Sequence, residues 1–140
     1  LVYTIFLLGT ALGSDFPRYL SQSAAFDAIH REGVDTGSLI LTDLDTGCDA
    51  ELMGYRPTLD TRVEVLCGVC GGEDVLTPAA AALSGMNTTT YCEELGIMAA
   101  VLPSGYYDEA VSCLQGTGWV VAHDDGTTVA LVSPNAKSRD

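Results

Sequence analysis

Basic residues are scarce in this chain of 140 residues, which has six lysines and arginines against 19 aspartates and glutamates. Lys137 is the only lysine, and the formal net charge at neutral pH is −13. A negative field of this size repels phosphate backbones and anionic lipid headgroups, which disfavours nucleic acids and membrane surfaces as partners. The field favours cations and basic proteins, although a large excess of carboxylates also serves simply to keep an apolar chain soluble.

Long apolar runs and linkers are also lacking. The run over residues 1–8, with the sequence LVYTIFLL, is too short to cross a bilayer. Residues 2–8 are rich in β-branched and aromatic side chains, which predicts a strand that is interior or covered by a partner. No linker, charge block or low-complexity stretch divides the sequence, so we expect residues 1–140 to form a single domain.

Complete catalytic and phosphate-binding motifs are absent. The serines lie in no G-x-S-x-G pattern, and no glycine cluster follows an expected strand in a phosphate-binding pattern. The acidic residues between positions 43 and 51 do not follow an EF-hand, because Cys48 and Gly54 stand where its glycine and its bidentate glutamate are required. We interpret this segment as a solvated acidic loop. These absences favour a non-enzymatic protein over an enzyme, without deciding between them, and we expect no cofactor.

Hydrophobic periodicity predicts the element order β-α-β-β-α-β-α-β-β. The expected strands are residues 2–8, 38–43, 61–69, 96–102, 119–122 and 127–132, and the expected helices are residues 15–33, 77–83 and 107–116. Residues 44–60 are expected to form a polar connection, and Thr77 is expected to cap the second helix. The fold class is then α+β: an antiparallel or mixed sheet with about three helices packed on one face, in a ferredoxin-like (split β-α-β) style.

The cysteines are five in number, so at most two disulfide bonds can form within the chain. They are Cys48, Cys67, Cys70, Cys92 and Cys113. Cys67 and Cys70 form a C-x-x-C pattern, which is compatible with a redox pair or, together with His123, with part of a zinc site. A structural thiol or a disulfide to a more distant cysteine is the expected role. We predict that Cys67 and Cys70 are not bonded to each other, because Cys70 lies beyond the end of the strand that carries Cys67.

Two further groups of residues are candidates for a site. His123 is followed by Asp124 and Asp125 in an expected hairpin turn, and a carboxylate can orient an imidazole for acid–base chemistry. Tyr106–Tyr107 and Trp119 could together form a ligand-binding face. We expect Trp119 to belong to the core instead, because it begins an apolar strand.

Secretion is the expected localisation, with the cytoplasm as the alternative. Leu1 is an unusual first residue and suggests processing, and Asn87 begins a glycosylation sequon. We expect a small, acidic, non-enzymatic interaction protein of the toxin, effector or structural-subunit type. Its partner would be a protein, preferably basic, or a second copy of the chain, and no transmembrane segment is expected. The alternatives are a redox or metal-binding protein using Cys67 and Cys70, and an intracellular ferredoxin-like domain that binds a regulatory ligand.

We predict that the protein is more stable at about pH 5 than at about pH 8. Crowded carboxylates have a higher pKa in the compact native state than in the expanded unfolded chain, so the native state binds more protons. The free energy of unfolding then rises as the pH falls through that range. Thermal melts at both pH values measure this, and added salt should narrow the difference by screening the repulsion. A higher melting temperature at pH 8 in low salt would contradict the prediction.

Overall fold

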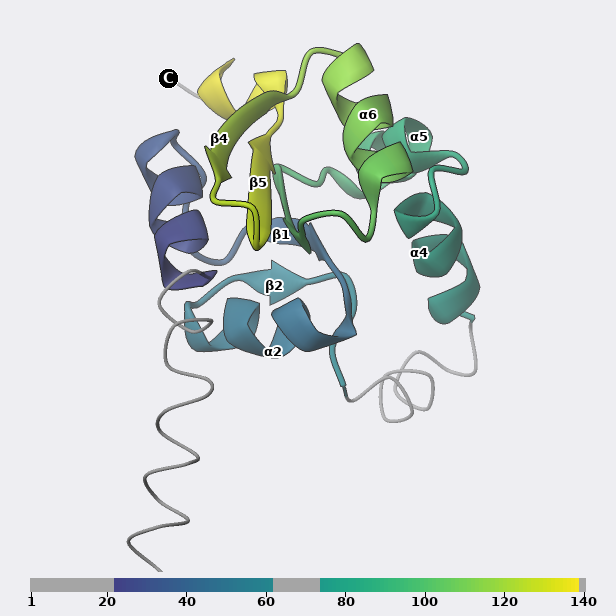
Figure 1. The fold of residues 1–140 in the computed structure, drawn as a ribbon, viewed down its shortest axis with the longest axis horizontal. Helices are drawn as coiled ribbons and strands as arrows, with labels where there is room; N and C mark the ends of the chain where they lie inside the picture. Colours follow the sequence, from purple (N-terminus) through teal and green to yellow (C-terminus); the bar gives the residue numbers. More distant parts are fainter. Residues whose placement is uncertain (1–21, 62–73, 139–140) are drawn as a thin grey trace, which may run out of the picture.

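The computed structural model describes residues 22–61 and 74–138. These residues form a five-stranded mixed sheet in the order β2-β1-β3-β5-β4, with five helices and one short 3-10 helix around it (Figure 1). The expected α+β class and the mixed sheet are confirmed. The expected strand at residues 2–8, nearly all of the strand at 61–69, and the Cys67–Cys70 pair lie outside the described residues.

The strands and helices have the following bounds and directions. The strands are β1 (Leu39–Thr42), β2 (Arg56–Pro57), β3 (Ala99–Pro103), β4 (Val120–Asp124) and β5 (Thr128–Val132). The helices are a first described helix (residues 22–31), α2 (Leu44–Leu52), α4 (Leu76–Leu83), α5 (Thr88–Leu95), α6 (Asp108–Gly116) and the 3-10 helix η1 (Pro134–Ser138). Strands β2 and β3 run parallel to β1, whereas β5 is antiparallel to both β3 and β4. None of the described helices is long and apolar enough to cross a membrane.

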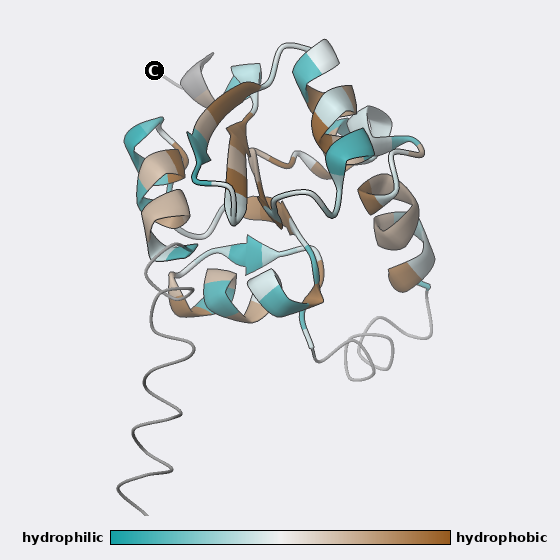
Figure 2. Cartoon of the chain, viewed as in Figure 1, coloured by the Kyte–Doolittle hydropathy of each residue, from teal (hydrophilic) through white to brown (hydrophobic). Residues whose placement is uncertain are grey.

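Helices cover both faces of the sheet. Along β3, Ala99 and Val101 belong to the core on one face, and Ala100 and Leu102 belong to the core on the other. The first described helix and α2 pack on the first face, and α4, α5 and α6 pack on the second. Figure 2 shows β5 in the hydrophobic colour along most of its length. Strands that are apolar on both sides need cover on both sides, because each exposed face would leave apolar surface in water.

The ferredoxin-like arrangement is therefore not found. That arrangement was expected with about three helices on one face, whereas the described residues hold five helices distributed over two faces. The strands expected at 38–43, 96–102, 119–122 and 127–132 are confirmed with shifted ends, as are the helices at 77–83 and 107–116.

Thr77 does not cap α4 with its side chain. Its N–H instead donates a hydrogen bond to Asp74 Oδ1 at 2.9 Å. Hydrogen bonds from Thr77 lower the pKa of Asp74.

The segment expected as a polar connection contains both α2 and β2. Helix α2 buries small or polar residues, namely Thr46, Gly47 and Ala50, so it shows no run of large apolar side chains at helical spacing. Strand β2 is only two residues long and contains Pro57, which is tolerated because β2 is at the edge of the sheet. Helix α5 was missed for a similar reason, since three threonines begin it and only Thr88 and Cys92 are buried.

Gly47 allows α2 to lie directly against the backbone that follows β2. A Cβ atom at this position would overlap the carbonyl oxygen of Leu59, which also accepts a hydrogen bond from Thr42 Oγ1 at 2.9 Å. The backbone of Leu59 is thus held between the end of β1 and the middle of α2. A side chain larger than hydrogen at position 47 would push these two elements apart.

We expect Gly47→Ala to destabilise the protein by about 2–4 kcal/mol, because the added methyl group meets backbone that cannot rotate away. Gly116→Ala is the matched control: Gly116 is also in a helix, but a Cβ atom there has no neighbour within 4 Å. That control should leave stability unchanged or raise it by up to about 1 kcal/mol, because alanine is the better helix former. Denaturant unfolding of both variants measures the difference. Equal effects would show that the α2–Leu59 contact does not limit side-chain size.

Candidate functional site

The carboxyl ends of β1 and β3 lie side by side in the sheet, and the chain leaves them in opposite directions. After β1 it enters α2, which contributes Ala50 to the core on one face of the sheet. After β3 it enters α6, which contributes Leu114 to the core on the other face. In open sheets with parallel strands, the crevice at such a switch point is where ligands bind. The topology therefore makes the carboxyl ends of β1 and β3 a candidate ligand site.

Two adjoining hollows lie at the carboxyl ends of β1 and β3. The first, here called the acidic hollow, has a volume of about 500 Å³ and is lined by Gln22, Asp43, Asp45, Pro103, Tyr106, Tyr107, Thr127 and Thr128. The second, here called the apolar hollow, has a volume of about 320 Å³ and is lined by Asp43, Leu44, Leu59, Leu76, Ala80, Leu83, Ser84, Tyr106 and Tyr107. Asp43, Tyr106 and Tyr107 line both hollows, so the two spaces lie next to each other, and we describe them together as one candidate site.

Asp43 is positioned by the junction between β1 and α2. It is buried, and its Oδ1 accepts a hydrogen bond from the N–H of Thr46 at 2.8 Å, which makes it the N-cap of α2. Asp45 lies in the first turn of the same helix and is exposed. Both carboxylates are favoured by the positive end of the helix dipole. Among the described residues, the buried hydroxyl of Thr46 has no hydrogen-bond partner.

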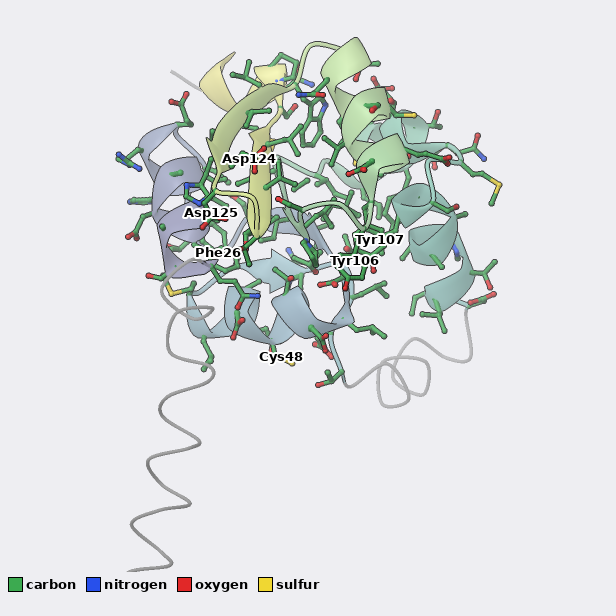
Figure 3. All side chains as sticks on the ribbon, in the orientation of Figure 1. Phe26, Cys48, Tyr106, Tyr107, Asp124 and Asp125 are labelled. Atoms are coloured by element: carbon green, nitrogen blue, oxygen red, sulfur yellow. The ribbon has the colours of Figure 1, made fainter. Side chains whose placement is uncertain are left out.

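Tyr106 and Tyr107 come from the loop between β3 and α6. Gly105 turns the chain there with a φ of 79°, and Figure 3 shows the two tyrosines together between α2 and α4. Tyr106 is 82% exposed, whereas Tyr107 is half-buried. Burial, followed by the charges of Asp43 and Asp45, raises the pKa of Tyr107. Tyr107 therefore keeps its phenolic proton at neutral pH and can donate a hydrogen bond.

The β4–β5 hairpin forms the remaining wall of the acidic hollow. Asp125 Oδ1 accepts hydrogen bonds from the N–H groups of Thr127 and Thr128, each at 2.9 Å. The N–H of Ser104 donates to the carbonyl oxygen of Thr127 at 2.9 Å, which ties the turn to the end of β3. Gly126 takes a φ of 78° in this turn, as the Asp-Gly signal in the sequence predicts. Short hydrogen bonds thus hold this wall in place.

The lining of the site favours non-covalent binding of a polar group. The described lining supplies carboxylates, phenols, hydroxyls and an amide, and it includes no lysine, arginine or histidine. Within residues 22–61 and 74–138, no group of three or more histidine, cysteine, aspartate or glutamate side chains is arranged to hold a metal ion. Among the described residues that line the hollows, no serine or cysteine lies beside a histidine, which is the arrangement that activates a nucleophile.

Sequence reasoning identified part of this site. Tyr106 and Tyr107 were candidates for a ligand-binding face, and they line both hollows. Asp43 and Asp45 were interpreted as part of a solvated loop, whereas they end β1 and begin α2. An aspartate that directly follows a buried strand and can cap a helix was the available signal for them. Gln22 was missed because nothing in the sequence places this residue near the end of β3.

His123 lies outside both hollows. Its Nε2 is 3.5 Å from Asp125 Oδ2 and makes no hydrogen bond, and the other oxygen of Asp125 holds the hairpin turn. Trp119 is buried in the core beside Leu114, as expected from the sequence. Asn87, the sequon residue, is exposed and directly precedes α5.

None of the three described cysteines lines either hollow. Cys48, Cys92 and Cys113 are free thiols, so the expected disulfide bonds are not found among the described residues. Burial raises the pKa of Cys92 to about 12, which makes this thiol unreactive at neutral pH. Cys92 and Trp119 line a separate cavity of about 260 Å³ near the amino end of β3, at the other end of the strands from the two hollows. Cys67 and Cys70 cannot be placed relative to either cavity, because they lie outside the described residues.

Comparison of the chain with protein-family models, with curated proteins and with solved structures finds no significant match.

Proposed function

We propose that the protein is a non-enzymatic binding domain whose ligand occupies the two hollows at the carboxyl ends of β1 and β3. The observation that carries this proposal is that Asp43, Tyr106 and Tyr107 line both hollows at a switch point of the sheet. Each hollow is within the size range of small-molecule sites, about 300–1,000 Å³. The proposal takes up the ligand-binding alternative from the sequence, without its ferredoxin-like fold.

The site is suited to binding because most of it is already formed. The cap on α2 holds Asp43, and the hydrogen bonds of the hairpin hold Thr127 and Thr128. A ligand that meets such a surface loses little free energy in ordering the protein. The exposed ring of Tyr106 then supplies a large contact area that water covers in the free state.

Fragment screening by protein NMR on the full chain tests the proposal, with a set that holds equal numbers of cationic, anionic and neutral fragments. We expect the shift changes to converge on the backbone amides of Asp45, Tyr106 and Thr127. Tyr106→Ala should weaken binding about fivefold, because an aromatic contact contributes about 1 kcal/mol. Leu95→Ala, an exposed position in α5 away from both hollows, is the control and should bind as the parent does. Fragments that bind only beside Trp119, or none at all, would refute the proposed site.

A second candidate function is the protein interaction expected from the sequence, with a basic partner outside the cell. Strand β4 favours it, because β4 is the edge of the sheet and pairs only with β5 among the described strands. Val120 and Val121 on this strand are 57% and 38% exposed. An open edge with exposed valines accepts an added strand. Asp124 ends the same strand and favours a basic residue in the partner.

Hydrogen exchange of the β4 amides tests this second function, with a synthetic peptide of alternating valine and lysine as the probe. We expect the peptide to slow exchange in β4, because it supplies acceptors to the open edge. Val120→Lys should abolish the effect through charge repulsion. Leu52→Lys, at a residue of α2 that is also exposed, should leave it unchanged. Equal protection in both variants would exclude β4 as the interaction surface.

A further inference from the structure

We infer that the ligand of this site is an organic cation, with an ammonium or guanidinium head in the acidic hollow and an apolar body in the apolar hollow. The inference rests on the proposed function and specifies the chemistry of its ligand. It follows from three features of the lining: the sign of the charge in the acidic hollow, the exposed apolar side chains of the apolar hollow, and the position of Asp43 between them.

The acidic hollow attracts positive charge. Asp43 and Asp45 both line it, and none of the described residues that line it is basic. Both carboxylates act on the same space, since each contributes to the raised pKa of Tyr107. The chain as a whole carries a formal charge of −13, which adds a long-range field of the same sign. The ring of Tyr106 offers a further favourable contact, because cations bind to the faces of aromatic rings.

The apolar hollow provides a surface for a hydrocarbon group. Leu44, at the start of α2, is 42% exposed, and Leu76, at the start of α4, is also exposed. Both line this hollow together with the buried side chains of Leu59 and Leu83. Leucines from two helices that are exposed around one hollow gain free energy when an apolar group covers them.

Asp43 excludes the simpler ligands because it lines both hollows. An apolar ligand that filled the apolar hollow would leave the charge of the Asp43 carboxylate in its wall without a counter-charge. An anion would be repelled by the same carboxylate and by Asp45. A small cation alone would leave Leu44 and Leu76 in water. Only a ligand that joins a cationic head to an apolar body satisfies both hollows together.

A matched series of four probes tests this inference by NMR titration of the full chain. Hexylamine has both the cationic head and the apolar body, methylamine has only the head, hexan-1-ol replaces the head by a neutral hydroxyl, and hexanoate replaces it by an anion. We expect hexylamine to bind with a dissociation constant on the order of 1–10 mM, as its small size allows. The other three should bind about tenfold more weakly or not at all, because each lacks a charge-assisted contact or the apolar contact.

Two pairs of variants assign the contacts within the site. Asp45→Asn should weaken hexylamine binding about fivefold and leave hexan-1-ol binding unchanged, whereas Glu94→Gln on α5 should affect neither. Leu44→Ser should weaken both probes, and Leu95→Ser, at a leucine that is 48% exposed on α5, should weaken neither. The two controls remove the same kind of group from the surface away from both hollows.

The outcomes separate the ligand class from the binding site. If hexan-1-ol or hexanoate binds in the two hollows as tightly as hexylamine, the inference about the cation is overturned and the proposed function stands. The same conclusion follows if a neutral polyol from the fragment set binds there and hexylamine does not. If neither the four probes nor any fragment shifts the amides of Asp45, Tyr106 and Thr127, both the inference and the proposed function are overturned.

Discussion

The hydrogen bond from the N–H of Thr46 to Asp43 Oδ1, 2.8 Å long, links the fold to the candidate site. It ends β1 and begins α2, and α2 then reaches β2 by lying against the backbone of Leu59, where Gly47 leaves the room. The same aspartate lines both hollows at the carboxyl ends of β1 and β3. One carboxylate oxygen thus serves the structure of the chain, and the residue as a whole gives the site its sign of charge.

The two-sided core explains why the site lies at the ends of the strands. Ala99, Ala100 and Ala130 are completely buried in the central strands, so helices pack closely over both faces of these strands. The ends of the strands are then the places where loops can carry exposed side chains. Tyr106 and Asp45 lie at such an end, where α2 and α6 leave the sheet toward opposite faces.

The strongest local patterns were predictable and the weaker ones were not. Strand β3, the β4–β5 hairpin and α6 follow from apolar periodicity and from the Asp-Gly turn, and the structure confirms them. Helix α2 could not be predicted in this way, because Thr46, Gly47 and Ala50 bury so little apolar surface that no periodic pattern results. It lies against the backbone of Leu59, which follows Gly47 by twelve positions in the chain. In the same way, Tyr106–Tyr107 could be proposed as a ligand face, but Asp43 and Gln22 could not be assigned to it.

What the sequence determined by itself was the α+β class, the negative field and the position of most strands, because these depend on composition and on neighbours within one element. The tertiary structure decided that helices cover both faces of the sheet. It also decided that Asp43, Tyr106 and Thr127 line one hollow at the carboxyl ends of β1 and β3. These three residues come from the junction between β1 and α2, from the loop after β3 and from the turn before β5. They meet because the chain crosses between the two faces of the sheet, and this crossing results from the packing of the whole domain, which no local pattern encodes.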